Sequence, residues 1–228
     1  MFKKNDKKGI DKKGGQKIGK ELDFASLEAY NLLRTNLSFS LPDNDAGKVI
    51  GITSPCPQEG KSTTSLNLSY SLAEAGHKVL LIDADMRRPS VSKTLDLPRS
   101  PGLSNMLTEE PDDAIRNGVL TENLSVLLSG DIPPNPSELI GSKKMQKLIE
   151  RFRTEYNYII VDLPPVNSVS DPLAMSKNLD GMVVIVRHGY TRRSDVIEAM
   201  RQIKLVNVNV LGFVYNGAMR NKPSYTHK

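Results

Sequence analysis

Short apolar runs, rich in β-branched residues, recur along the chain and alternate with longer segments of helical periodicity. The runs are too apolar to alternate with polar residues, which is typical of parallel strands covered on both faces. Because strands and helices alternate, we expect an α/β fold: a doubly wound, mostly parallel sheet flanked by helices, with ligands beyond the C-terminal ends of the strands. Strands are predicted over 48–54, 78–85, 124–130, 156–164, 181–187 and 208–216, and helices over 61–75, 142–155 and 192–205.

The basic charge of the chain is concentrated at its N-terminus. Residues 1–20 contain eight lysines and two aspartates, a net charge of +6, whereas the whole chain carries +5, so residues 21–228 sum to −1. We expect a disordered basic tail over 1–20, a folded domain over 21–217 and a C-terminal tail over 218–228. The basic tail is either simply solvated or attracted to an anionic membrane surface, at about 1 kcal/mol per lysine near the lipid.

Composition argues against several other classes of protein. The folded part shows no basic stripe with interleaved aromatic residues, so no nucleic-acid partner is expected. The single cysteine, Cys56, permits no internal disulfide and agrees with a reducing compartment. The sequence contains no apolar stretch of about 18 residues that would predict a membrane span, and its N-terminus lacks the apolar segment of a secretory signal. We therefore expect a cytoplasmic protein.

The segment SPCPQEGKST (54–63) follows the first predicted strand and precedes the first predicted long helix. It matches the second half of the phosphate-binding pattern G-x-x-x-x-G-K-[ST] through Gly60, Lys61 and Ser62, whereas Pro55 stands at the first glycine position. Gly60 lets the backbone approach phosphate oxygens, Lys61 supplies positive charge, and the Ser62 hydroxyl is a ligand for Mg²⁺. The alternative is a helix capped by hydroxyl side chains after a tight turn.

Acidic residues end two of the other predicted strands. Asp83 and Asp85 close LLIDADMRRP (80–89), where the period of two puts both carboxylates on one side of the chain. Asp162 ends the strand in YIIVDLPPV (158–166). Three carboxylates beside a phosphate loop can hold Mg²⁺ and its water shell. Taken singly, each aspartate could equally be a helix cap or a turn residue.

These motifs, together with SGDIPPNPSELI (129–140), resemble those of the bacterial tyrosine kinases (BY-kinases), the P-loop kinases of capsule and exopolysaccharide systems. The resemblance runs from about residue 22 to 217. The wider class includes partitioning and cell-division-site ATPases, which carry a signature lysine five positions before the loop lysine. Cys56 occupies that position here, which favours the kinase branch.

The resemblance implies a role for each matching residue, with ATP and Mg²⁺ as cofactors. Lys61 would contact the β- and γ-phosphates, Ser62 would bind Mg²⁺, and Thr63 would hold the α-phosphate side. Asp83 would be the base for the attacking hydroxyl, and Asp85 and Asp162 would hold the metal directly or through water. Asn216 would either read the adenine edge or serve as a turn residue at the end of the last strand.

Two segments depart from the family pattern. The family builds a ring of subunits with a Glu, Arg, Arg motif at three-residue spacing on an N-terminal helix, whereas this chain has Glu28, Asn31 and Arg34. We predict that Glu28 and Arg34 contact a neighbouring subunit; the alternative is a solvated helix face. The family also carries a C-terminal tyrosine cluster, and here residues 217–228 offer one tyrosine, Tyr225, as the phosphoacceptor or as an ordinary tail residue.

The resemblance implies an ATP-dependent protein-tyrosine kinase that autophosphorylates in trans and regulates capsule or exopolysaccharide polymerisation or export. It would form a homo-oligomer and work with a membrane-spanning activator on a separate polypeptide, at the inner face of the cell membrane. An alternative is a non-kinase P-loop ATPase switch that controls oligomerisation or membrane recruitment. A third possibility is an adaptor that binds nucleotide without turnover.

Overall fold

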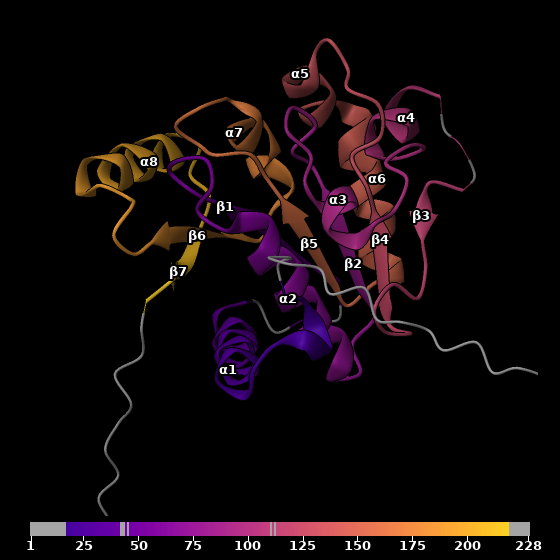
Figure 1. Ribbon diagram of the computed structural model, residues 1–228. Helices are drawn as coiled ribbons and strands as arrows, with labels where there is room; N and C mark the ends of the chain where they lie inside the picture. The colour runs from indigo at the N-terminus through magenta and orange to yellow at the C-terminus, as the bar shows by residue number, and fades with distance from the viewer. Residues whose placement is uncertain (1–16, 42–43, 45, 110, 112, 219–228) are drawn as a thin grey trace, which may run out of the picture.

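The computed structural model describes residues 17–41, 44, 46–109, 111 and 113–218 (Figure 1). Seven strands form one sheet in the order β3-β4-β2-β5-β1-β6-β7, and all neighbouring pairs are parallel except β3 with β4. This confirms the predicted α/β class. The strands are β1 (Lys48–Thr53), β2 (Val79–Asp83), β3 (Ile115–Arg116), β4 (Leu124–Leu127), β5 (Tyr158–Asp162), β6 (Gly181–Arg187) and β7 (Val210–Asn216).

The three long predicted helices form within one residue of their predicted ends. They are α2 (Lys61–Glu74), α6 (Lys143–Glu155) and α8 (Arg193–Leu205). Local capping explains two of these boundaries, because the Ser142 hydroxyl accepts from the Met145 N–H at 3.1 Å at the start of α6 and Gly76, at φ 89°, follows the end of α2. The remaining helices are α1 (Phe24–Ser40), α3 (Val91–Leu95), α4 (Leu103–Thr108), α5 (Pro136–Ile140) and α7 (Asp171–Met175), with 3₁₀ turns η1 (Gly19–Glu21) and η2 (Ser176–Asn178).

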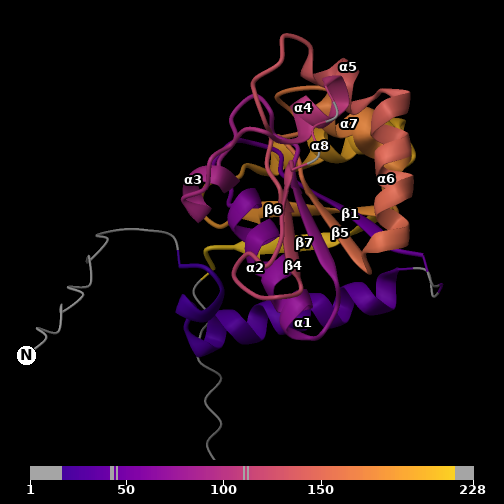
Figure 2. The same ribbon diagram turned by 90° about the vertical axis from the view of Figure 1, so that its right-hand side faces the viewer.

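The sheet is the middle of three layers. One core joins it to α1, α2 and α3, and contains Leu37, Leu66 and Val91. The other joins it to α4 through α8, and contains Leu103, Phe152 and Ile203. Figure 1 shows α1 and α2 below the strands and α7 and α8 above them, and in the turned view of Figure 2 α1 runs along the base while α6 stands at the side. Both faces of the sheet are therefore covered, as the continuous apolar runs predicted.

The N-terminal end of the described chain is packed onto α2. Ile18 and Gly19 are buried, and the Gly19 N–H donates to Asn67 Oδ1 at 2.9 Å. A Cβ on Gly19 would lie 3.1 Å from the Tyr70 ring. Ile18 and Gly19, within the range 1–20 that we expect to be a tail, are thus packed against the domain, whereas Lys17 and Lys20 are exposed. Residues 1–16 and Tyr225 lie outside the described residues.

The register brings the ends of three strands together. Asp83 at the end of β2 faces Asp162 at the end of β5, and Asp162 also faces Ile52 near the end of β1. The loop after β1 is the predicted phosphate loop, so the acidic strand ends and this loop meet at one edge of the sheet. Among the described residues, no helix is both long enough and apolar enough to cross a membrane.

Candidate active site

The phosphate loop joins β1 to α2 through two residues in the left-handed region. Gln58 has φ 62° and Gly60 has φ 93°, and α2 begins at Lys61. The Lys61 side chain is at the start of the helix, where the N–H groups of the first turn lack partners in the helix and favour an anion. Lys61 is buried, at 8% exposure, and therefore lies within the site and not on the open surface.

Asn216 is placed against this loop. Its Nδ2 donates to the Glu59 carbonyl at 2.8 Å, and a Cβ on Gly60 would lie 2.1 Å from that nitrogen. The positive φ of Gly60 favours glycine, and any side chain at this position would also have to displace the Asn216 amide. The amide nitrogen of Asn216 is engaged with the loop backbone; its predicted role at the adenine edge stays a prediction.

The three aspartates form a buried acidic cluster. Asp83 and Asp162 are fully buried and Asp85 is 7% exposed. Asp83 Oδ1 accepts the Asp85 N–H at 3.3 Å, and Asp162 Oδ1 accepts the Ser65 hydroxyl of α2 at 3.2 Å. Strand ends and the first turns of α2 therefore bring together the groups that the sequence singled out.

The electrostatics of the cluster follow from its burial. Burial, together with the carboxylates of Asp162 and Asp85, raises the pKa of Asp83 well above its usual value. Burial also raises the pKa of Asp162 to about 6, and the Lys61 ammonium and the Ser62 hydroxyl oppose this increase. Like charges this close cannot all be ionised at little cost unless a cation joins them.

The residues present fit a divalent cation with oxygen ligands. Asp83 Oδ2 and Asp162 Oδ2 are buried and have no hydrogen-bond partner within the described residues. No group of three or more His, Cys, Asp or Glu side chains in this part of the chain is arranged to hold a metal by itself. Mg²⁺ usually binds one or two carboxylates and takes its other ligands from a hydroxyl, nucleotide phosphates and water.

The helix predicted to contact a neighbouring subunit is α1, and its two predicted residues lie in different environments. Glu28 is exposed and accepts from Asn31 Nδ2 at 3.0 Å. Arg34 is half-buried and donates from Nη1 to the Ser71 carbonyl of α2 at 2.6 Å. Arg34 thus has partners within its own chain, whereas Glu28 faces outward; their contact with another subunit remains a prediction.

An ion pair lies next to the acidic cluster, and sequence reasoning did not identify its acidic partner. Arg87 follows Asp85 on the loop after β2, and its Nε and Nη2 donate to the two oxygens of Asp171 at 3.0 and 3.1 Å. Asp171 is fully buried at the start of α7 and also accepts from the Ser137 hydroxyl of α5. A separation of 84 residues leaves no periodic signal that would join them.

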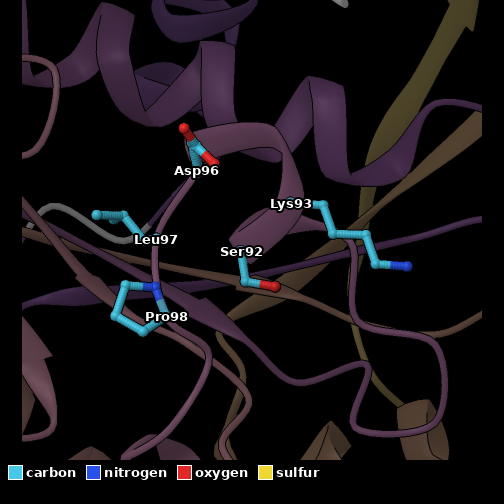
Figure 3. A pocket seen from close by; sticks show the side chains of 5 residues that line it. All are labelled: Ser92, Lys93, Asp96, Leu97 and Pro98. Carbon is cyan, nitrogen blue, oxygen red and sulfur yellow. The ribbon is translucent and has the colours of Figure 1, made fainter.

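A hollow of about 370 Å³ lies beside α3 (Figure 3). Its lining includes none of the predicted site residues, so this hollow is separate from the candidate active site. It is lined by Ser92, Lys93, Asp96, Leu97 and Pro98.

Comparisons with known proteins agree on the class of this site. A family model described as "ParA: NUBPL iron-transfer P-loop NTPase" matches residues 46–228. Tyrosine-protein kinase YwqD of Bacillus subtilis is 38% identical over 200 residues, which cover 86% of this chain and 83% of that protein. The chain belongs to the bacterial tyrosine kinases. It is therefore a protein-tyrosine kinase by homology, within the wider P-loop NTPase class.

Solved structures, among them a bacterial tyrosine kinase domain, have the same fold. The kinase domain of Escherichia coli tyrosine kinase ETK is 30% identical with a TM-score of 0.80, over 89% of this chain and 80% of that one. The chimerical protein CapA2B2 is 38% identical with a TM-score of 0.78, over 82% and 83%. A more distant likeness, in fold alone, is the septum site-determining protein MinD of Pyrococcus horikoshii complexed with Mg-ADP, at 23% identity and a TM-score of 0.62, over 74% and 70%.

Proposed function

We propose that this bacterial tyrosine kinase transfers the γ-phosphoryl group of ATP to tyrosines of other copies of itself, and that it acts in the polymerisation or export of a capsular or extracellular polysaccharide. The observation that carries the proposal is the buried cluster of Asp83, Asp85 and Asp162 beside Lys61, at the ends of adjacent strands. Phosphoryl transfer is catalysed mainly by positioning and charge neutralisation, which such a cluster supports.

Each residue then has a role that fits its environment. Lys61 neutralises the β- and γ-phosphates, and Ser62 and Thr63, in the first turn of α2, hold the metal and the α-phosphate side. Asp83, at the end of β2 beside Asp162, accepts the proton of the attacking tyrosine hydroxyl when it is ionised. Asp85 and Asp162 hold Mg²⁺, which when bound would neutralise charge on the transferring phosphoryl group.

The wider assembly is part of the same proposal. Glu28, on the exposed face of α1, is available to a neighbouring copy in a homo-oligomer. The activator is a membrane-spanning protein on a separate chain, and the likeness to the CapA2B2 chimera supports such a partnership. Residues 1–20, with a net charge of +6, would help to hold the kinase at an anionic inner membrane surface.

A second candidate function is a P-loop ATPase switch without kinase activity. One sequence feature favours it: residues 217–228 contain a single tyrosine, Tyr225, instead of a cluster. The same nucleotide site would then hydrolyse ATP, and the nucleotide state would control oligomerisation or membrane binding.

One assay separates these functions. The purified chain is incubated with ATP and Mg²⁺, with and without an activator tail, and phosphotyrosine and released phosphate are measured in the same tubes. Lys61→Ala and Tyr225→Phe serve as comparison variants. We expect phosphotyrosine that is lost in both variants. Phosphate release that depends on Lys61, with no phosphotyrosine on either chain, would favour the ATPase switch and contradict the kinase proposal.

A further inference from the structure

Glu59 directly precedes the glycine and lysine of the phosphate loop, and its side chain is fully buried. The carboxylate accepts two hydrogen bonds. Oε2 accepts the backbone N–H of Cys56 at 2.8 Å, at the other end of the same loop, and Oε1 accepts the hydroxyl of Thr191. Glu59 therefore closes the loop on itself and also joins it to a distant part of the chain.

Thr191 lies in the connection between β6 and α8, which is built to hold its hydroxyl in place. Thr191 Oγ1 accepts the backbone N–H of Arg187 at 2.8 Å while it donates to Glu59, so both hydrogen-bonding functions of the hydroxyl are used. The Arg187 guanidinium in turn donates to the Gln58 carbonyl at 2.8 Å. The end of β6 and the connection after it thus contact the loop at two successive residues.

The loop has a conformation that needs support. Gln58 has a side chain but adopts φ 62°, and such backbone is held only when surrounding contacts determine it. A loop that had to order itself when the nucleotide arrives would lose part of the binding free energy as conformational entropy. Contacts from within the protein remove that loss in advance.

We propose that Glu59 and Thr191 form a positioning pair that holds residues 56–60 in the phosphate-binding shape before nucleotide arrives. The connection after β6 then sets the affinity of the site for nucleotide, although neither side chain need touch it. The inference rests on one part of the proposed function, namely that this loop binds nucleotide phosphates. It does not depend on whether the phosphoryl acceptor is tyrosine or water.

The test is a calorimetric titration of the full chain with MgADP, which requires no turnover. Thr191→Val keeps the shape of the side chain and removes the hydroxyl, whereas Thr191→Ser keeps the hydroxyl. We expect Thr191→Val to weaken MgADP binding about 10-fold, equivalent to about 1.4 kcal/mol, and Thr191→Ser to stay within about 2-fold. Thr154→Val is the matched control, because Thr154 is exposed on α6 and its hydroxyl bonds only to the Arg151 carbonyl among the contacts described.

A double-mutant cycle separates positioning from a general effect on folding. If the two side chains act as a pair, Thr191→Val will weaken binding no further, within about 2-fold, once Glu59 has been replaced by Ala. Thermal unfolding without nucleotide checks that each variant folds, and Glu59→Leu, which fills a similar volume without either acceptor oxygen, replaces Glu59→Ala if that variant does not. Folded Thr191→Val that binds MgADP like the unaltered chain, or additive losses in the cycle, would overturn the inference. An unaltered chain that binds no MgADP would overturn the nucleotide site itself, and the inference with it.

Discussion

Asp83 and Asp162 face each other at the ends of neighbouring parallel strands, and in each the Oδ2 atom is buried without a hydrogen-bond partner among the described residues. An unpartnered buried carboxylate oxygen is costly, and two of them side by side are more so. The arrangement is understandable as a site that gives up stability in the metal-free state in order to bind a cation tightly.

The first prediction concerns stability and pH. The folded pKa of Asp162, about 6, lies above the ordinary value of 3.8, so the folded state binds the proton more tightly than the unfolded state. The contribution of the protonated Asp162 carboxyl to the free energy of unfolding is complete below about pH 4. It is lost as pH rises through 6, a change of about 3 kcal/mol. Asp162→Asn removes this loss, so without metal the variant should be more stable than the unaltered chain at pH 7.5, by a margin that is much smaller at pH 4.5.

The measurement is urea unfolding of both proteins in a chelator at the two pH values. Glu122→Gln, at an exposed loop position, is the control and should change neither value. A stability difference between Asp162→Asn and the unaltered chain that does not vary with pH would contradict the prediction. Added Mg²⁺ should stabilise the unaltered chain more than Asp162→Asn, because the amide carries no negative charge and has one oxygen fewer than the carboxylate.

The second prediction concerns Gly60. A Cβ at this position meets Asn216 Nδ2 at 2.1 Å on a backbone with φ 93°, so Gly60→Ala must displace the Asn216 amide from the loop and also strains the backbone. We expect MgADP binding to weaken roughly 100-fold or more, equivalent to about 3 kcal/mol. Gly76→Ala is the matched control, since Gly76 also has positive φ, at 89°, but open space around its Cβ position. It should cost about 1 kcal/mol of stability and leave the affinity for MgADP unchanged; equal affinities in the two variants would count against the clash.

The third prediction separates two residues that the sequence had grouped. Glu28 is exposed, so Glu28→Lys should reduce self-association without loss of stability. Arg34 donates to the Ser71 carbonyl at 2.6 Å, so Arg34→Ala should reduce the free energy of unfolding by about 1 to 2 kcal/mol as well. Light scattering across a range of concentrations, with urea unfolding of each variant, checks both effects. Unchanged self-association in Glu28→Lys would show that this face of α1 is not an interface.

How much of the site could be read from the sequence depends on whether each contact follows a local rule. Lys61 and the strand-end aspartates were predicted because parallel strands end at one edge of a sheet and a phosphate loop has a fixed spacing. The contacts of Arg34 were not predicted, because the pattern of the helix does not show which element covers the face that carries Arg34. β3 was missed as well, because a strand of two residues has no period to detect. Glu59 and Thr191 are 132 positions apart and depend wholly on the tertiary fold.

The last prediction concerns the ion pair that tertiary structure alone reveals. Arg87 holds the loop that carries Asp85 against α7, through two hydrogen bonds to the fully buried Asp171. Arg87→Ala would leave that carboxylate buried with the Ser137 hydroxyl as its remaining side-chain partner among those contacts. We expect a loss of about 1 to 3 kcal/mol in the free energy of unfolding, below the value for a fully buried pair because the Arg87 side chain is 40% exposed.

The control variant is Arg201→Ala, which breaks an exposed ion pair. The side chains of Arg201 and Glu198 are 71% and 46% exposed, so the loss should be less than about 0.5 kcal/mol in the free energy of unfolding. Because the loop after β2 also carries Asp85, Arg87→Ala should in addition weaken Mg²⁺-dependent nucleotide binding, whereas Arg201→Ala should not. Urea unfolding and MgADP titration of the two variants measure both effects, and equal losses of stability in the two variants would contradict a structural role for the buried pair.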